Sequence, residues 1–442
     1  KIRTGVRLTT DFAVDFAPRT SDDDPARYLA ADWWNAPLFA ACTPQHYCDV
    51  GVLDTILPRH PDRFQRYEQS LDNAFEDFVA RRERQREYGF INYGDWFGER
   101  TWNWGNNEYD TSWALAVNFL RTGNRDMLDQ AIISAAHSAD VDTIHHHAAA
   151  DRVGYQYTHC IGHTAMYFPR DWKGMGGFNT HSGGRGGHIW SQGLFAVYAL
   201  TGEERLLETG RKINDMLAHH TTDFRYGAER TVGWPMVAVM AGYDFDANPY
   251  YRNAAKLMAD IVIWTQHPER GLWGHWIDGN ECDHAPRCWG SKPFMTGVLL
   301  RGLKMYDLVE PREDTRQTLQ DNVAYLFREM FMHQQERPGF VYSSCRHPRY
   351  SQTGSASRLS LIGPGVAYSV LIDPDQRQRE PLEYAADLYF NRAGLSGFGK
   401  SFTQGTCFLP TTMHDLKTLG ISEFPREPAA ASIRRQVPVV PH

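Results

Sequence analysis

The side chains best suited to chemistry are concentrated in a few short loops rich in glycine, tryptophan, asparagine, histidine and arginine. One loop reads WNWGNNEYD from Trp102 to Asp110, and another reads GGRGGH from Gly183 to His188. Histidine titrates near neutral pH and can move a proton, whereas arginine offers a permanent positive charge to an anion. Ordering such loops costs conformational entropy, which argues against a passive role. We therefore expect proton transfer beside a bound anion, with helix capping by Asn106 or Asp110 as the alternative.

Three later segments have the same character, and each precedes or opens an apolar stretch. They are Glu229–Trp234, Arg287–Lys292 and Tyr350–Gly354. A long connection from His145 to Gly187 is also dense in polar aromatics and histidines, and it includes YQYTHCIGH between Tyr155 and His163. A connection of that length in a compact domain is usually functional. The triple His145–His147 is expected to end an outer helix, where imidazoles favour the C-terminal dipole.

In six segments the apolar residues recur with the period of an α-helix that exposes one face to solvent. In the first, Leu71, Phe75 and Phe78 follow the i, i+4, i+7 spacing of an amphipathic helix. The other five are Leu128–Ala135, Leu206–Leu217, Tyr250–Ile261, Leu319–Met330 and Leu382–Tyr389.

Between these helices lie segments that are apolar on all sides, a pattern typical of buried helices. They are Ser112–Leu120, Leu194–Leu200, Val232–Ala241, Phe294–Leu303, Leu359–Ile372 and a weaker candidate, Thr411–Leu419. Six outer and six inner helices in alternation predict a mainly α fold, the (α/α)6 toroid. An open α-solenoid is the alternative, but it would have a more regular period.

In such a ring all inner helices run in the same direction, so their N-termini gather at one mouth. Each N-terminus has unpaired N–H groups and a partial charge of roughly +0.5. Convergent helix starts favour an anionic ligand such as a carboxylate. The polar loops described above stand just before the inner helices, so we expect them to converge.

The composition excludes several classes of function. The 442 residues have a net charge of −7, with no basic stripe, which argues against a nucleic-acid partner. No apolar run is long enough for a membrane span. Aromatic residues make up 13% of the chain, which suits sugar stacking as well as a large helical core.

The seven cysteines do not match a common metal site. Cys282-Asp283-His284 with Cys288 has a spacing unlike the usual zinc patterns, so we favour loop thiols or a disulfide. We expect no cofactor and no catalytic metal, and nothing in the sequence indicates a structural calcium ion.

The string YGDWFGERTWNWGNNEYDTSW, from Tyr93 to Trp113, resembles the toroid domain of the exo-rhamnogalacturonan lyases, polysaccharide lyase family 26. Four further elements follow in the order expected of that family. They are HSADVDTIHH (137–146), HCIGHT (159–164), GGHIW (186–190) and ERTVGW (229–234). The resemblance covers about Arg63 to Tyr306 well and the rest weakly.

The resemblance implies β-elimination in a rhamnose–galacturonic acid backbone, with exo release of an unsaturated uronic acid. A lyase must neutralise the uronate carboxylate, remove the C5 proton and protonate the departing O4. We assign neutralisation to Arg230, Arg185 and Asn106 or Asn107. The proton-transfer candidates are His163, His188, Tyr109 and Tyr157. Stacking or hydrogen bonding to the sugar is expected of Trp104, Trp190, Trp234, Glu108, Glu229 and His159.

We divide the chain at residue 62. Residues 1–62 are expected to form a β-rich stub and linker, because Ile2–Ala17 alternates apolar and polar residues and an acidic run follows. Residues 63–442 would form the toroid catalytic domain with a C-terminal tail. Since the chain begins at Lys1, a missing upstream segment could supply a β-domain partner, and we favour an extracellular or periplasmic location.

Three other functions remain open at this point. A glycoside hydrolase on the same fold would need a carboxylate pair, for which Glu108, Asp110, Asp140, Asp142 and Glu229 are candidates. A sugar epimerase would work through two histidines. A non-catalytic glycan-binding protein would need stacking platforms but few ionisable groups.

Overall fold

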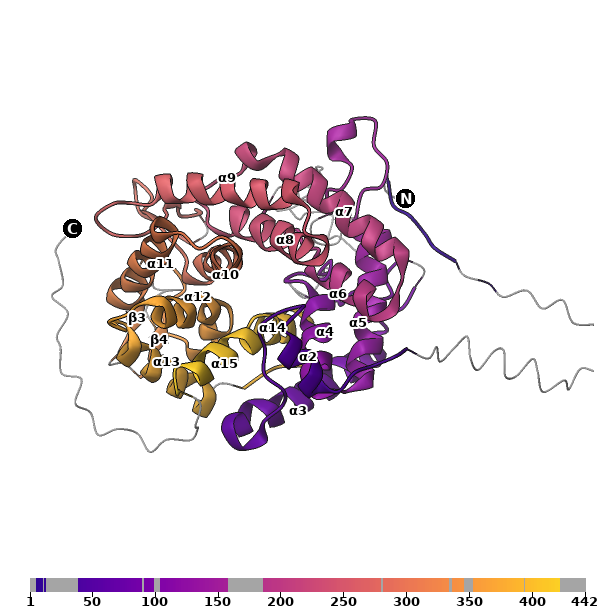
Figure 1. Ribbon diagram of the computed structural model, residues 1–442, viewed down its shortest axis with the longest axis horizontal. Coiled ribbons are helices and arrows are strands. Elements are labelled where there is room, and N and C mark those ends of the chain that lie inside the picture. Colours follow the sequence, from indigo (N-terminus) through magenta and orange to yellow (C-terminus); the bar gives the residue numbers. More distant parts are fainter. Residues whose placement is uncertain are drawn as a thin grey trace, which may run out of the picture.

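The computed structural model describes residues 5–10, 12, 39–89, 91–98, 104–157, 186–279, 281–333, 336–345, 353–392 and 394–421. Figure 1 shows two concentric layers of helices that follow one another around a ring. The outer layer is α3 (Pro61–Gln85), α5 (Arg125–His137), α7 (Glu204–His219), α9 (Pro249–Thr265), α11 (Glu313–Tyr325) and α13 (Arg379–Arg392). The inner layer is α4 (Thr111–Thr122), α6 (Gln192–Thr201), α8 (Arg230–Asp246), α10 (Pro293–Val309), α12 (Leu359–Ile372) and, sharing the sixth place, the successive helices α14 (Gly399–Thr406) and α15 (Leu409–Thr418). The predicted (α/α)6 toroid is confirmed.

The ring is closed by contacts between its first inner helix, α4, and α14 near the end of the described chain. The indole N–H of Trp113 on α4 donates to the carbonyl of Cys407, just after α14, over 2.9 Å. The hydroxyls of Thr111 and Thr403 lie 3.2 Å apart across the same seam. Helix α14 also packs against α3. An open solenoid would leave these two ends apart, so the helices form a closed ring.

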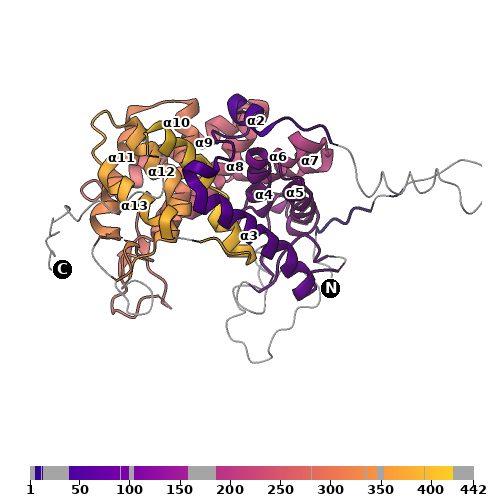
Figure 2. The same ribbon diagram turned by 90° about the horizontal axis from the view of Figure 1, so that it is seen from below.

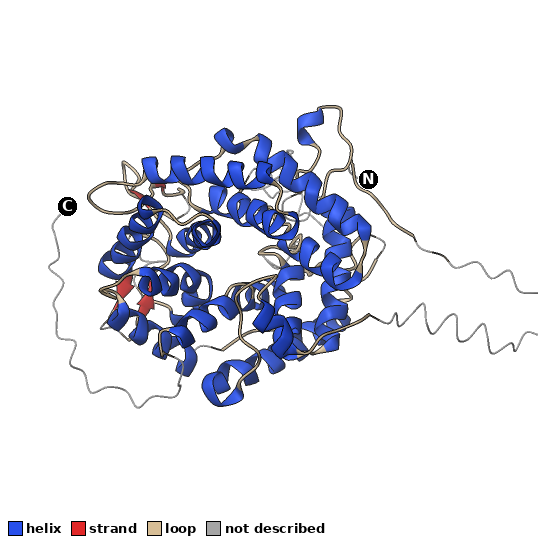
Figure 3. Ribbon diagram, in the orientation of Figure 1, coloured by secondary structure: helices blue, strands red, loops and turns tan. Residues whose placement is uncertain are grey.

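Burial differs between the two layers as the apolar patterns predict. Every residue of α12 from Leu359 to Val370 is buried, so this helix is enclosed on all sides. Helix α7 instead buries one face, with Leu206, Ile213 and Leu217 in the core. Figure 3 shows that helices make up nearly the whole ring and that the strands are confined to short pieces.

Glycines allow neighbouring inner helices to approach closely. A Cβ on Gly233 of α8 would lie 2.6 Å from the backbone nitrogen of Leu299 on α10. A Cβ on Gly297 of α10 would lie 2.6 Å from the carbonyl oxygen of Leu361 on α12. Backbone atoms cannot move aside as a flexible side chain can, so these two positions set the spacing of three inner helices.

The remaining elements are short and lie in the connections. Two antiparallel pairs occur, β1 (His275–Trp276) with β2 (Trp289–Gly290) and β3 (Phe331–Met332) with β4 (Gly339–Phe340). Turns of π-helix follow α5 at Ser138–Asp142 and α11 at Leu326–Met330. Turns of 3-10 helix occupy Ala150–Arg152, Thr221–Asp223 and Ala356–Arg358.

The triple His145–His147 does not end an outer helix. Helix α5 ends at His137, and the π-helical turn that follows separates it from the triple. His145 instead contacts the carbonyl of Ala139 through Nε2 at 2.5 Å.

Only part of residues 1–62 is described, so the predicted β-rich stub stays a prediction. Residues 5–10 are extended and bond to the ring at single points, with Arg7 N–H donating to the Asp140 carbonyl over 2.8 Å. Helix α2 (Pro44–Val50) begins after the cap Thr43, whose hydroxyl accepts from the His46 N–H. Proline at the first helical position favours this start. The predicted boundary at residue 62 falls within the first turn of α3.

The connections that precede the inner helices extend from one side of the ring. Figure 2 shows loops coloured salmon to orange on the side opposite α2. In the part of the chain described here, no helix is both long and apolar enough to cross a membrane.

Candidate active site at the inner-helix N-termini

The segment that leads into α4 is held in an unusual backbone conformation. Asn106, Asn107, Tyr109 and Asp110 all have positive φ, between 47° and 72°. Asparagine and aspartate tolerate this region, but a bulky tyrosine rarely adopts it. Each strained residue costs on the order of 1–3 kcal/mol and persists only when its surroundings impose it. Such clusters occur preferentially at functional sites, and this one includes a predicted catalytic residue, Tyr109.

Hydrogen bonds from the scaffold impose this conformation. The carboxylate of Asp95 accepts the backbone N–H groups of Asn106 at 2.7 Å and Asn107 at 2.8 Å. The Asn106 amide donates to Asp142 at 2.8 Å, and the Asn107 amide donates to the Ser134 carbonyl at 3.2 Å. Both asparagines are buried, so their side chains hold the loop together. These contacts give both asparagines a positioning role, and their predicted contact with a substrate stays a prediction.

Asp110 caps α4 and ties it to the next inner helix. Its carboxylate accepts the Trp113 N–H at 3.0 Å and, from α6, the Gly193 N–H at 3.0 Å. Burial raises the pKa of this carboxyl, and these hydrogen bonds oppose the rise. The capping alternative is correct for Asp110.

Arg230, at the start of α8, lies between a histidine and a tyrosine. Its Nη2 atom is 3.1 Å from Nε2 of His188, and its guanidinium also hydrogen-bonds Tyr109. Arginine can only donate hydrogen bonds, so Nε2 of His188 must be the acceptor and the ring proton sits on Nδ1. Nδ1 faces Glu108, whose Oε1 lies 3.7 Å away. The site thus sets the histidine tautomer by a cation on one side and a carboxylate on the other.

Helix α14 contributes two further polar groups. Lys400 Nζ lies 2.8 Å from Oε2 of Glu108 and 5.9 Å from the centre of the Tyr109 ring. Gln404 hydrogen-bonds Tyr109. Burial raises the pKa of Tyr109, while Arg230 and Lys400 oppose the rise, so its hydroxyl keeps its proton at neutral pH. A buried, protonated phenol beside two cations is better suited to give a proton than to take one.

A second group of polar side chains comes from the loops before α10 and α12. The Tyr342 hydroxyl donates to Glu281 at 3.0 Å and lies within electrostatic range of Arg230 and Tyr109. Burial raises the pKa of Tyr342. The Arg358 guanidinium lies 5.6 Å from the centre of the Tyr342 ring, and the Lys292 ammonium lies 6.0 Å from it. Residues at the starts of α4, α6, α8, α10, α12 and α14 therefore meet, as the convergence of helix N-termini predicts.

The three predicted stacking tryptophans are buried, and two of them adjoin this cluster. Trp234 packs edge-on against Tyr109 at 5.8 Å and against Trp190 at 5.7 Å, measured between ring centroids. Both tryptophans are buried, and Trp104 is buried against Phe97. In this structure, then, Trp234 packs against Tyr109 and all three rings are buried among other side chains.

Two other predicted residues are placed within the scaffold. Glu229 is fully buried, where it accepts from Thr296 at 3.3 Å and faces Nδ1 of His275 at 3.5 Å. Burial raises the pKa of Glu229. Tyr157 is tied to the loop by its carbonyl, which accepts from the Asn106 amide at 3.1 Å. The predicted residues His159, His163 and Arg185 lie outside the described residues.

Sequence reasoning missed Lys400, Gln404, Tyr342 and Arg358. Lys400 follows the rule used for the other loops, because it stands at the start of an inner helix. The sixth inner helix was expected at Thr411–Leu419, which matches only α15, so α14 and its polar residues were overlooked. Tyr342 precedes α12 by a longer connection, and no local pattern marks it.

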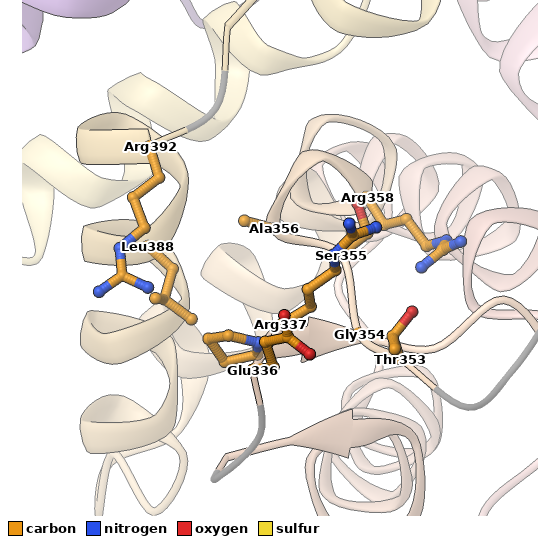
Figure 4. A pocket seen from close by; sticks show the side chains of 10 residues that line it. Glu336, Arg337, Thr353, Gly354, Ser355, Ala356, Arg358, Leu388 and Arg392 are labelled. Carbon is orange, nitrogen blue, oxygen red and sulfur yellow. The ribbon is translucent and has the colours of Figure 1, made fainter.

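An open groove of about 470 Å³ adjoins the cluster on the α12–α13 side. Figure 4 shows Leu388 and Arg392 of α13 along one side and Thr353, Gly354 and Ser355 along the other. Arg337 and Arg358 also line it. Because Arg358 also lies over the Tyr342 ring, the groove and the cluster share a cation.

Comparisons with known proteins identify the same architecture. Residues 37–163 match the model of the PcRGLX-like protein C-terminal alpha/alpha toroid domain. An uncharacterised protein of Bacillus subtilis, YetA, is 29% identical over 157 residues, an alignment that spans 32% of this chain and 18% of that protein. The match is therefore confined to a minor part of the relative.

Two solved structures resemble the ring over most of its length. One is a polysaccharide lyase, 12% identical, with a TM-score of 0.51 and coverage of 80% of this chain and 98% of the lyase. The other is the unsaturated glucuronyl hydrolase of Bacillus sp. GL1, 11% identical, with a TM-score of 0.50 and coverage of 82% and 100%. At such low identity the likeness concerns the fold, and it confirms the toroid.

Proposed function

We propose that this protein is a glycan-processing enzyme that acts on a uronate-containing polysaccharide, and more specifically a lyase that cleaves a rhamnogalacturonan-type chain by exo β-elimination. The observation that carries this proposal is the position of Arg230 between Tyr109 and His188. A cation flanked by two proton-transfer groups matches the three requirements of elimination next to a carboxylate. The family-model match over residues 37–163 and the toroid fold agree with it.

The charge balance around the cluster favours an anionic ligand. Arg230 and Lys400 bring two positive charges, and the carboxylate of Glu108 lies against His188 and Lys400. Helix N-termini at α4, α6 and α8 add partial positive charge. A uronate carboxylate would offset this excess of positive charge. Neutralising the carboxylate in turn makes the C5 proton of the sugar more acidic.

His188 would be the base and Tyr109 the acid. When the uronate carboxylate draws the Arg230 guanidinium, the lone pair on Nε2 of His188 becomes available to the C5 proton. The C5–H electron pair then forms the C4=C5 double bond, and the C4–O4 bond breaks. Tyr109 gives its hydroxyl proton to O4, and the proton on His188 returns to the tyrosinate after product release, so protons balance over one turnover.

The carboxylates in the described part of the chain argue against a hydrolase that uses an acid pair. Asp110 caps α4, and Glu229 bonds Thr296. Asp140 pairs with Arg7 and Arg205, while Asp142 accepts from Asn106. Each of these four carboxylates is thus engaged by the scaffold. A hydrolase would have to use one of them in spite of these contacts, which favours the lyase.

The groove beside Arg358 supports an acidic chain as substrate. Arg337, Arg358 and Arg392 line it, with one carboxylate, Glu336. A polysaccharide whose terminal uronate reached Arg230 could extend past Tyr342 into this groove. We expect the groove to bind the part of the chain that is retained after cleavage.

The test is incubation with a rhamnogalacturonan I backbone while the ultraviolet absorbance of the unsaturated uronate is followed. We expect absorbance to rise with the wild type, and the rate to fall by roughly 100- to 10,000-fold in both Tyr109→Phe and His188→Ala. The controls Tyr250→Phe and His219→Ala change exposed residues on α9 and α7 and should keep the wild-type rate. New reducing ends without absorbance would instead identify a hydrolase, and binding without turnover a glycan-binding protein.

A further inference from the structure

Three cysteines and a histidine meet beside the hairpin that precedes α10. Nδ1 of His284 lies 3.4 Å from Sγ of Cys282, 3.5 Å from Sγ of Cys288 and 3.6 Å from Sγ of Cys345. These four ligand atoms all lie within 4.8 Å of one another. Cys282, His284 and Cys288 belong to the β1–β2 connection, whereas Cys345 follows β4 in the loop before α12. We refer to the four residues as the Cys3His cluster.

The distances agree with four ligands around one metal ion. Zinc binds thiolate sulfur at about 2.3 Å and imidazole nitrogen at about 2.0–2.1 Å in tetrahedral structural sites. Tetrahedral angles with those bond lengths place each sulfur about 3.5–3.6 Å from the nitrogen. All three sulfur–nitrogen distances fall within about 0.2 Å of that value. The three sulfurs are thus spaced around the nitrogen as ligands of one ion would be, and the whole set stays within 4.8 Å.

The surroundings also suit a structural metal. Cys282 and Cys345 are buried and pack with Ile277, while His284 stands at the surface and closes the cluster. The backbone N–H of Cys288 donates to Sγ of Cys282 at 3.3 Å, a contact that favours a thiolate. A softer ligand set of three sulfurs and one imidazole selects zinc over calcium or magnesium.

We propose that Cys282, His284, Cys288 and Cys345 bind one zinc ion in a closed, four-ligand structural site. Four protein ligands leave no open position for water or substrate, so the ion would serve the fold and not the chemistry. The short local motif, Cys-x-His-x-x-x-Cys, resembles no common zinc pattern, which is why the sequence favoured loop thiols or a disulfide. The fourth ligand, Cys345, lies far away in the sequence and comes close to the other three only in the folded ring.

The ion would hold together the β1–β2 connection and the loop before α12, which both contribute residues to the candidate active site. Glu281, next to Cys282, accepts from Tyr342 at 3.0 Å and pairs with Lys292. Ser291 and Ser344 exchange hydrogen bonds at 3.1 and 3.0 Å along the same seam. Removing the ion should therefore loosen both Tyr342 and the start of α10, without touching His188 or Arg230.

The first test is the metal content of the full-length protein purified under reducing conditions, measured by inductively coupled plasma mass spectrometry. We expect one zinc ion per chain, and a content that falls towards zero in Cys345→Ser and in His284→Ala. The control Cys42→Ser changes an exposed cysteine outside the cluster, and His219→Ala changes an exposed histidine; both should keep the ion.

The second test replaces zinc with Co²⁺ in the wild type after chelation. Tetrahedral thiolate ligation gives cobalt strong visible d–d bands and a near-ultraviolet sulfur-to-metal band, and both should be absent in Cys345→Ser. The metal-free protein should also unfold at a lower temperature than the zinc form. These readouts do not depend on activity, so they stand whether or not the protein is a lyase.

Two results would overturn the proposal. One is a reduced wild-type protein that contains no zinc and develops no cobalt spectrum. The other is an intact mass that shows a disulfide among Cys282, Cys288 and Cys345 in the protein as purified, with the remaining thiol open to alkylation and no metal retained.

Discussion

Lys400 and Glu108 meet across the seam where the ring closes. Their side chains form an ion pair at 2.8 Å. Glu108 precedes the first inner helix, whereas Lys400 lies in α14, where the chain has passed around the whole ring. Glu108 also faces Nδ1 of His188. Closing the ring and completing the candidate site are therefore one structural event, because the contact exists only when both ends of the toroid are in place.

The first prediction follows from this pair. Lys400→Met should lower the free energy of unfolding by on the order of 1–3 kcal/mol, because the nearly inaccessible Glu108 carboxylate loses a compensating charge. The lysine is partly exposed, which keeps the loss below that of a fully buried pair. Urea unfolding measures the change. The double variant Glu108→Gln/Lys400→Met should recover much of the loss, and strictly additive effects would contradict the coupling.

The second prediction concerns the shape of the cation at residue 230. Arg230→Lys keeps the charge but loses the planar fork that reaches both His188 and Tyr109. We expect kcat to fall by roughly 100-fold, since a displacement of about 1 Å is sufficient for such a loss. Steady-state kinetics on the uronate substrate would measure it. Arg211→Lys is the control, because Arg211 pairs with Asp246 on the outside of the ring. Equal kinetics for both variants would remove Arg230 from the mechanism.

The third prediction is a dependence of stability on pH at Glu87. Burial raises the pKa of this carboxyl from 4.5 to about 7, with the Phe97 N–H as the main opposing contact. Between these two values the folded chain binds the proton more strongly than the unfolded chain, so stability decreases as pH rises from about 4.5 to 7. Glu87→Gln, which resembles the protonated form, should be more stable than the wild type at pH 8 by on the order of 2–3 kcal/mol.

Thermal or urea unfolding at pH 5 and pH 8 provides the comparison for Glu87. The gain should be clearly smaller at pH 5, where the folded wild type already carries the proton. Glu76→Gln, an exposed change on the same helix α3, is the matched control and should show no such difference. A gain that is the same at both pH values would show that ionisation of Glu87 is not its cause.

The fourth prediction tests how tightly the inner helices pack. Gly233→Ala places a methyl group 2.6 Å from the backbone nitrogen of Leu299, so α8 and α10 must separate or bend. Overpacking of this kind costs about 1–3 kcal/mol of unfolding free energy. Gly394→Ala is the control, because its nearest neighbour would be 3.9 Å away. If both variants unfold at the same urea concentration, close packing at Gly233 is refuted.

The helices could be predicted because their signal is local. An apolar face repeated along Leu206–Leu217 predicts α7, and an all-apolar run over Leu359–Ile372 predicts α12. Alternation of the two types predicts the ring. The inner helices of such a ring all run in the same direction, so their N-termini were predicted to converge. Glu108, Tyr109, His188 and Arg230 do lie together in the structure.

The direction of individual side chains could not be predicted. The position of Asn106 and Asn107 before an inner helix predicted substrate contact, and the structure adds that their amides donate to Asp142 and to the Ser134 carbonyl inside the protein. Trp234 was expected to face a sugar, and it is buried with its ring packed edge-on against Tyr109. A sequence also carries no mark of contacts between distant loops, which is why Cys345 could not be linked to Cys282.

The left-handed run that leads into α4 limits which residues can replace Tyr109 over evolutionary time. Tyr109 is held at φ 72° by the surrounding ring, and a glycine there would relieve the backbone strain. The same change would leave a cavity beside Trp234, and losing a buried aromatic ring costs roughly 3–5 kcal/mol, more than the strain it relieves. The packing around the ring therefore retains a side chain that the local backbone disfavours.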